Sequence, residues 1–261
     1  MIGNDLISIG GFKVATHGVG IAVAFLLGMW LSIRLAKRQG FDSEIVADFM
    51  IYAIIGGVLG ARLWYVILNI GYYASNPLKI LAVWEGGLAI QGGILGGIAI
   101  GIWFAKKRNI SLWQFADILA PGLILGMAIG RVGDFLSGGE YGIVSERFGF
   151  VYQKPGTDAY MANGPVPLVP AVLYEALGDL LIMWFLLAVK KDKLPEGFKF
   201  LWMLILYSVV RFSLEFVRGD SILIFFGLRS AQVTSVLTIL VTAYIMMRRK
   251  EKLAKKSSPS T

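Results

Sequence analysis

The sequence contains no cysteine and a single histidine, His17. The lack of cysteine excludes a disulfide framework, a thiolate metal site and a cysteine nucleophile. With one histidine, and with no group of carboxylates that lacks a neighbouring arginine, we expect neither a metal ion nor another cofactor. Charged residues are scarce too, at 16% of the chain, against about 25% in a typical soluble domain.

Apolar residues make up 56% of the 261 residues, and the mean hydropathy is +0.69. One globular core of this size cannot hide so much apolar surface, so the surrounding solvent is lipid. The N-terminal residues lack the basic region and cleavage site of a signal peptide. Helices that cross a bilayer need about 20 apolar residues. We predict an all-α polytopic membrane protein with seven such helices, at roughly 18–36, 46–69, 87–105, 113–131, 170–189, 199–217 and 229–247.

The basic residues predict the orientation of these helices. Sixteen of them lie in alternate connections and in the C-terminal tail, and six lie on the other side. Because cytoplasmic loops carry the excess of lysine and arginine, we expect the N-terminus outside and the C-terminus in the cytoplasm. The net charge of +8 is then an orientation signal, and no nucleic-acid partner is expected. We predict one transmembrane domain over 1–247, with an outer loop or small head region at 132–169, and a basic cytoplasmic tail at 248–261.

Two of the apolar stretches carry paired glycines, Gly56-Gly57-x-x-Gly60 and Gly92-Gly93-x-x-Gly96-Gly97. Small residues at this spacing let two membrane helices approach closely, so we expect these helices to pack through their glycines. The pairs do not lie between a strand and a helix, which excludes a nucleotide-binding loop. Asp48 and Asp117 fall near the inner ends of spans, where we expect capping or interfacial roles.

Other ionisable residues lie deeper in the spans, where they are costly and usually face a cavity or a partner. In the sixth span, Tyr207, Arg211, Glu215 and Arg218 recur at helical spacing and would share one stripe of a helix. One interpretation is an ion-pair ladder in which Glu215 bridges the two arginines. The other is that the same face binds an anionic ligand, and the two interpretations are compatible.

The fourth span ends in GRVGDFLSGGEYG, residues 130–142. Arg131 stands at the end of the apolar run, and Asp134 and Glu140 follow among glycines. Glycines let the backbone approach a ligand closely, and a guanidinium can bind two oxygens of a phosphate. The alternative is a turn from which Arg131 reaches the membrane interface.

Polar residues of six predicted spans fall at the same level, in or just below the outer leaflet. Such an arrangement predicts a cavity for a large anionic, amphipathic ligand, and a phospholipid fits that description. The residues are His17, Arg62, Gln91, Arg131, Glu175 and those from Arg211 to Arg218.

Six blocks of sequence, in order along nearly the whole chain, resemble the prolipoprotein diacylglyceryl transferases. This resemblance implies a multi-pass enzyme of the bacterial cytoplasmic (inner) membrane. Such an enzyme moves the diacylglyceryl group of phosphatidylglycerol onto the lipobox cysteine of a preprolipoprotein at the outer leaflet and releases glycerol phosphate. The implied partners are phosphatidylglycerol, the lipobox signal peptide and membrane lipid. The blocks are GARLWY (60–65), WEGGLAIQGG (84–93), GRVGDFLSGGEYG (130–142), PAVLYE (170–175), YSVVRFSLEFVR (207–218) and SAQVTS (230–235).

The resemblance also implies roles for individual residues. Arg131 and Arg211 match the essential arginines of the family, and Gly142 matches its signature glycine. We expect the two arginines to stabilise the departing phosphate, with Arg218 and Arg62 as further candidates. The other matched functional positions are Glu175, Tyr207, Glu215 and Arg218.

The chain departs from the family pattern inside this site. Gln91 replaces the functional histidine of the third span, Asp134 replaces an asparagine, and Glu140 lies one residue later than the signature glutamate. His17 replaces the tyrosine of the first span. Gln91 can orient a substrate but cannot accept a proton at neutral pH. The base that ionises the thiol is therefore His17, or a carboxylate of the 134–140 segment, or no protein group if the arginines suffice.

Other functions are also compatible with these residues. The same lipid site would suit a transferase with another acceptor, or a relative that only binds lipid. A transporter or receptor would need a polar path across the membrane, but the polar residues thin out toward the inner side.

Overall fold

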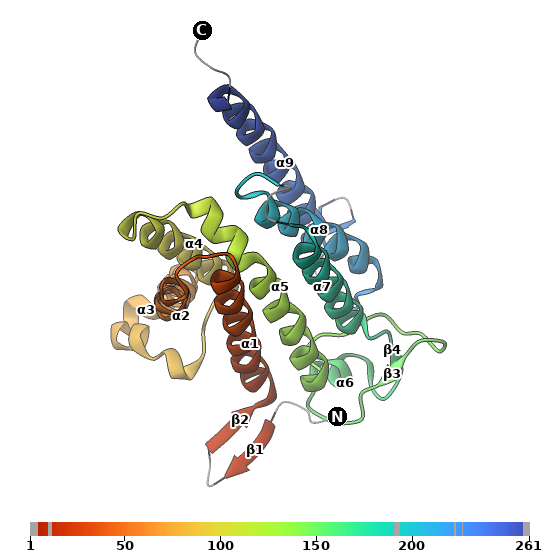
Figure 1. Ribbon diagram of the computed structural model, residues 1–261. Helices are drawn as coiled ribbons and strands as arrows, with labels where there is room; N and C mark the ends of the chain where they lie inside the picture. The colour runs from red at the N-terminus through yellow and green to blue at the C-terminus, as the bar shows by residue number, and fades with distance from the viewer. Residues whose placement is uncertain (1–4, 10–11, 191–193, 222, 226, 258–261) are drawn as a thin grey trace. The chain divides into compact units, whose positions relative to one another are not determined.

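The structure is a computed structural model that describes residues 5–9, 12–190, 194–221, 223–225 and 227–257. It confirms that the fold is built mainly of helices, with short strand pairs beside them (Figure 1). Within the described ranges, six helices are long and apolar enough to cross a membrane. They are α1 (Thr16–Arg38), α2 (Ser43–Leu68), α5 (Leu112–Ser137), α7 (Ala171–Ala188), α8 (Phe198–Leu214, extended by the 3-10 turn η4 over Glu215–Val217) and α9 (Ser230–Ser257).

The remaining predicted span, 87–105, corresponds to α4 (Ile90–Lys107). This helix ends on two lysines and is not one of the six. Large apolar side chains on the spans are widely exposed: Leu59 is 63% and Trp184 is 69% exposed. In a chain of this composition, such surfaces are expected to face lipid.

Short elements complete the fold. They are the helices α3 (Ile70–Ser75) and α6 (Asp158–Asn163), the 3-10 turns η1 (Pro77–Leu81) and η2 (Val83–Glu85), and the antiparallel strand pairs β1–β2 (Asp5–Ile9, Phe12–Ala15), β3–β4 (Phe150–Val151, Pro167–Leu168) and β5–β6 (Leu223–Phe225, Leu228–Arg229).

The chain divides into two compact units, which we describe separately. The first comprises residues 1–32 and 117–261, and the second comprises residues 33–116. In the second unit, α2 and α4 pack antiparallel through the paired glycines, as the sequence predicts. A Cβ on Gly60 would lie 2.3 Å from the carbonyl oxygen of Gly92, and one on Gly96 would lie 2.2 Å from that of Gly56. Asp48 of α2 pairs with Arg108 just after α4.

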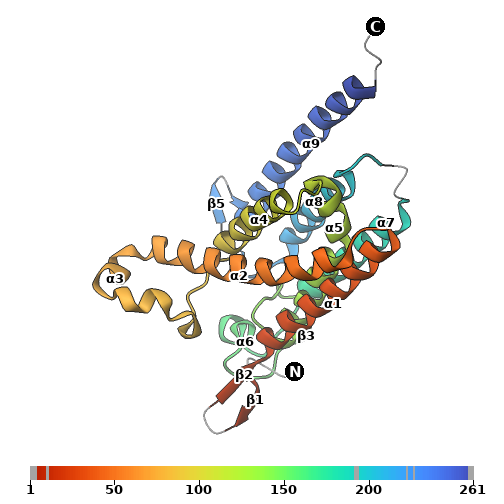
Figure 2. The ribbon, with the colours of Figure 1, turned by 60° about the vertical axis from the view of Figure 1, so that its left-hand side comes forward.

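In the first unit, α1 and α5 also run antiparallel in glycine-to-glycine contact. Figure 2 shows both helices from a second side. A Cβ on Gly28 would lie 2.6 Å from the carbonyl oxygen of Gly122, and one on Gly20 would lie 3.1 Å from Cα of Gly133. Asp117 acts as the expected cap, since its carboxylate accepts hydrogen bonds from the first backbone amides of α8, at 2.7 Å from Gly197 and 2.9 Å from Phe200.

Two predicted boundaries are wrong. The fourth span does not end at Arg131, because α5 continues to Ser137 and carries Arg131 and Asp134 on one helix. The single helical stripe of the sixth span is also broken, because α8 ends at Leu214 and Arg218 is extended, with φ −81° and ψ 138°. The backbone at Arg218 forms a bridge with Gly142 instead of continuing the helix.

The segment from Gly138 to Pro170, here called the head segment, has a small core of its own. Tyr152, Ala159 and Leu168 are buried in it and pack against Phe135 at the end of α5. Burial, with a smaller contribution from Asp220, raises the pKa of Tyr152 to about 12. Figure 1 shows α6, β3 and β4 of this segment gathered beside the C-terminal end of α5. The head segment therefore lies at the same end of the unit as Arg131.

Candidate active site

Two carboxylates hold three arginines together in the first unit. Glu175, near the start of α7, accepts from Arg131 at 2.9 Å and from Arg211 at 3.2 Å, and lies 3.5 Å from Arg218. Glu140 lies between two of the same arginines, 2.9 Å from Arg131 and 2.7 Å from Arg218. We call these five residues the arginine–carboxylate cluster. It joins α5, the head segment, α7 and α8 at one point.

The three arginines of the cluster differ in exposure. The side chains of Arg131 and Arg211 are 18% and 19% exposed, whereas that of Arg218 is 6% exposed and that of Glu175 is fully buried. Arg218 is also held on its other edge by a two-point contact with Asp220, at 2.9 Å and 2.6 Å. Arg131 and Arg211 are thus the cationic groups that a ligand can reach, and Arg218 is a supporting group.

For two charged groups outside the spans, Glu140 and Arg218, neighbouring opposite charges change the pKa more than burial does. Burial alone would raise the pKa of Glu140, but Arg131 and Arg218 hold it below its ordinary value. Burial alone would lower the pKa of Arg218, but Glu140 and Asp220 raise it further than burial lowers it. Both groups therefore stay charged at neutral pH.

Gly142 brings the head segment and Arg218 together. A Cβ on Gly142 would lie 2.4 Å from the carbonyl oxygen of Val169 and 2.8 Å from that of Val217. The amide of Ile143 donates to the Val217 carbonyl at 2.9 Å, and the amide of Gly219 donates to the Tyr141 carbonyl at 3.0 Å. Only a residue without a side chain fits between these backbones.

Further contacts fix the ends of the cluster. Tyr207 donates its hydroxyl to Glu175 at 3.3 Å, and Glu215 lies 3.3 Å from Arg211, one turn away. Arg229, the last residue of β6, donates to the backbone carbonyls of Glu215 and Arg218. The ladder expected from the sequence thus exists between Arg211 and Glu215, but Glu215 does not bridge to Arg218, which pairs with Glu140 and Asp220.

His17 lies beside this cluster. Its Nδ1 is 2.7 Å from the carboxylate of Asp134, and its side chain is 55% exposed. Asp134 also lies 3.3 Å from Arg131. The Gly20–Gly133 contact explains the pairing, since His17 and Asp134 flank those glycines on the two antiparallel helices. When Nδ1 donates to Asp134, Nε2 is left to accept a proton.

Arg62 and Gln91 belong to the other unit. Gln91 is exposed in the first turn of α4. Arg62 is 6% exposed, and its guanidinium donates to the backbone carbonyls of residues 79, 80, 82, 86 and 87. All five of its N–H groups are used in this way, so in this structure Arg62 holds the connection between α3 and α4.

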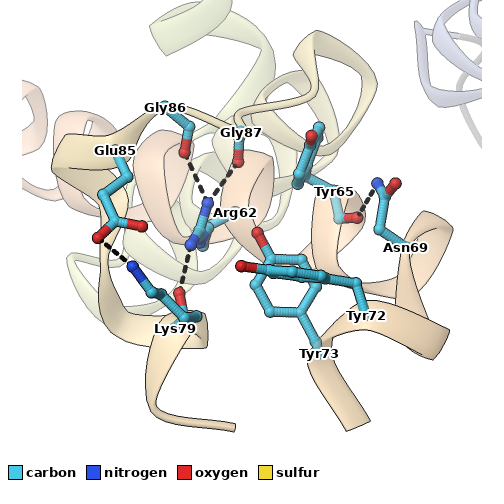
Figure 3. Close-up of a pocket in the computed structure, with 9 residues that line it drawn as sticks. All are labelled: Arg62, Tyr65, Asn69, Tyr72, Tyr73, Lys79, Glu85, Gly86 and Gly87. Atoms are coloured by element: carbon cyan, nitrogen blue, oxygen red, sulfur yellow. Dashed lines mark hydrogen bonds and ion pairs between the residues drawn. The ribbon is translucent and has the colours of Figure 1, made fainter. Parts of the chain in front are cut away.

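Figure 3 shows the pocket that Arg62 borders, with a volume of about 420 Å³. Tyr65, Tyr72 and Tyr73 line one side of it, and the ion pair of Lys79 with Glu85, at 2.5 Å, lines another. The guanidinium carbon of Arg62 lies 5.2 Å from the ring centre of Tyr73. The side chain of Arg62 therefore stabilises the wall of the pocket through its ring contact and its backbone hydrogen bonds.

Ten of the twelve residues that the sequence singles out meet in the first unit. The sequence does not predict two further residues of the site. Asp220 accepts two hydrogen bonds from Arg218, and Arg229 donates to the backbone carbonyls of Glu215 and Arg218. Asp220 stands two residues after an arginine at the end of an apolar run, and that proximity is the only signal in the sequence. The ten are His17, Arg131, Asp134, Glu140, Gly142, Glu175, Tyr207, Arg211, Glu215 and Arg218.

The fold and the site define a multi-pass membrane protein whose helices converge on a partly exposed arginine–carboxylate cluster. The family model of prolipoprotein diacylglyceryl transferases matches residues 4–248. This chain therefore belongs to the prolipoprotein diacylglyceryl transferase family.

Named relatives agree with this assignment. The chain is 39% identical over 249 residues to the phosphatidylglycerol--prolipoprotein diacylglyceryl transferase of Bacillus cereus (strain G9842), and 36% identical over 252 residues to that of Bacillus licheniformis. The protein of the same name from Bacillus velezensis is 35% identical over 252 residues. Each match covers 94% of this chain and 91% of the relative.

Proposed function

We propose that this protein transfers the diacylglyceryl group of phosphatidylglycerol to the lipobox cysteine of preprolipoproteins in the bacterial cytoplasmic membrane. The observation that carries the proposal is the pair of partly exposed arginines, Arg131 and Arg211, held by one buried carboxylate in a chain of this family. A phosphodiester supplies the anionic oxygens that two guanidinium groups bind best.

In the proposed step, the sulfur of the substrate cysteine attacks C3 of the glyceryl group. A carbon–sulfur bond forms, the bond from C3 to the phosphate oxygen breaks, and glycerol phosphate leaves with the electron pair. Arg131 and Arg211 stabilise the charge that grows on the phosphate. Their positions are fixed by Glu175 before the substrate arrives.

The thiol must lose its proton, since the thiolate is the nucleophile. We propose that Nε2 of His17 takes this proton while Asp134 holds Nδ1, because the 2.7 Å contact orients the ring as a carboxylate does in a base-assisted nucleophile. Glu140, which pairs with two arginines, is a poorer base because its charge is already stabilised.

The proposal includes the topology. With seven spans, α4 included, the N-terminus and the cluster face the outer leaflet, and the basic C-terminal end of α9 is cytoplasmic. The alternation of basic residues along the chain supports this orientation.

The test uses purified protein in detergent with phosphatidylglycerol and a lipobox peptide, and mass spectrometry detects peptide that has gained a diacylglyceryl group. We expect the wild type to modify the peptide and Arg131→Ala and Arg211→Ala each to lose about 100-fold or more of the rate. Arg147→Ala, at an exposed arginine of the head segment, is the matched control and should keep the rate. An unmodified peptide under conditions where a Bacillus relative works would contradict the proposal.

A further inference from the structure

Asp179 is a buried carboxyl group that the proposed mechanism does not use. It lies in the middle of α7 and is fully buried. Neither of its carboxyl oxygens has a hydrogen-bond partner. Buried polar groups are almost always paired in native proteins, so an orphaned carboxyl inside a membrane helix requires a physical explanation.

The surroundings of Asp179 decide its protonation state. On the buried face of α7 it stands between Glu175, one turn earlier, and Ile182, which belongs to an apolar core with Ile124 and Met203. Arg131 on α5 and Tyr207 and Arg211 on α8 contact Glu175, one helical turn before Asp179. An ionised carboxylate without a donor is very unfavourable in such a place, which favours the protonated, neutral form of Asp179.

Binding of a phosphate at Arg131 and Arg211 would leave Glu175 with fewer hydrogen-bond donors. Without a ligand, Arg131 and Arg211 both donate N–H groups to Glu175. A bound phosphate would accept some of these N–H groups instead. Glu175 is fully buried and cannot turn toward water. A buried carboxylate that loses some of its partners is destabilised. Tyr207 and Arg218 still contact Glu175, and a further donor would replace the N–H groups of the two arginines.

We propose that Asp179 is a positioning residue whose protonated carboxyl donates a hydrogen bond to Glu175 when a lipid phosphate takes over the arginines of Glu175. Residues four apart lie on one face of a helix and can reach one another. The two groups then share a single proton, as paired carboxyls do, and no proton enters or leaves the site in this step. The inference rests on the proposed function only in requiring a phosphate-bearing lipid as ligand.

Difference infrared spectroscopy in detergent tests the protonation state. The spectrum of the wild type minus that of Asp179→Leu should contain the carbonyl stretch of a protonated carboxylic acid. Its frequency should change when phosphatidylglycerol is added, and should not change with diacylglycerol, which lacks the phosphate. A carboxylate signal in place of the acid signal, or an acid signal indifferent to both lipids, would overturn the inference.

Kinetics separate this role from a merely structural one. Asp179→Leu removes the donor, so the KM for phosphatidylglycerol should rise about tenfold or more, by the usual strength of a hydrogen bond to a charged group. Asp179→Asn keeps an N–H donor and should recover much of that loss. The matched control Asp117→Asn changes a carboxylate on α5 that caps α8, and it should leave the KM unchanged.

Thermal unfolding shows whether the leucine variant folds, and we expect its Tm to rise because an orphaned polar group is gone. A raised Tm with an unchanged KM would mean that Asp179 has no role in lipid binding. If the wild type binds phosphatidylglycerol but transfers nothing, the proposed function fails, whereas the infrared result still decides the role of Asp179.

Discussion

At the scale of single residues, Glu140 is the carboxylate that ties the head segment to the spans. It contacts Arg131 at 2.9 Å and Arg218 at 2.7 Å, and these arginines hold its pKa below the ordinary value although burial opposes them. A group with a lowered pKa in the folded state stabilises the fold above its unfolded pKa, and that contribution is lost as the pH falls through the folded pKa.

Glu140→Gln should therefore lower the Tm at neutral pH, because it leaves two arginines short of a partner. The Tm difference between wild type and variant should be constant above the ordinary glutamate pKa of about 4.3. Below that pH it should shrink as Glu140 in the wild type becomes protonated. Thermal unfolding in detergent at a series of pH values measures this, with the exposed Glu146→Gln as control. A difference that grows toward acid pH would contradict the assignment.

His17 gives a prediction about turnover. If Nε2 takes the thiol proton, His17→Ala should lower the rate of peptide modification at neutral pH by about 100-fold, the usual contribution of a general base. The defect should shrink as the pH rises toward the thiol pKa of about 8.5, because the substrate then ionises without help. Rates measured across this pH range decide the matter. A variant as active as the wild type at every pH excludes His17 as the base.

At the scale of elements, the backbone contact between the head segment and the end of α8 positions Glu140 against Arg218. Gly142→Ala would place a methyl group 2.4 Å from the Val169 carbonyl oxygen. We expect this variant to lose most of its transferase activity and to unfold at a lower temperature, since the bridge to Arg218 cannot form unchanged.

Gly130→Ala is the matched control for this change. Gly130 lies next to Arg131 on α5, and a Cβ there meets nothing within 4 Å. In a helix interior the substitution should stabilise by up to about 1 kcal/mol and leave activity intact. If both alanine variants behave alike in the peptide assay and in thermal unfolding, the close contact at Gly142 has no special role.

Sequence patterns predict where the helices lie better than they predict the residues at which the helices end. Apolar runs located every long helix, and the paired glycines of α2 and α4 correctly predicted their packing. The end of α8 was mispredicted because Arg218 leaves the helix to meet Gly142, a contact between residues far apart in sequence. No local sequence pattern encodes such a bridge. The extended backbone at Arg218 also lets Asp220 accept from its guanidinium, so that pairing is not predicted either.

At the scale of the whole molecule, the absence of cysteine makes the orientation measurable. Single cysteines placed at exposed positions of the described chain will be the only thiols present. Met161→Cys, in the head segment, should react with a membrane-impermeant maleimide in intact cells, and Lys37→Cys, near the end of α1, should react only after the cells are opened. The opposite pattern would reverse the predicted topology.

The internal ion pairs of the cluster also set conditions for an inhibitor. Arg131 already forms ion pairs with Glu140 and Glu175. An inhibitor must displace these carboxylates, which belong to the protein and lose no translational entropy when they bind Arg131. A compound with a single weak acid gains little from that exchange. A compound with two acidic groups, spaced to reach Arg131 and Arg211 together, offers both arginines a better partner than the protein provides, and this spacing is where medicinal chemistry should begin.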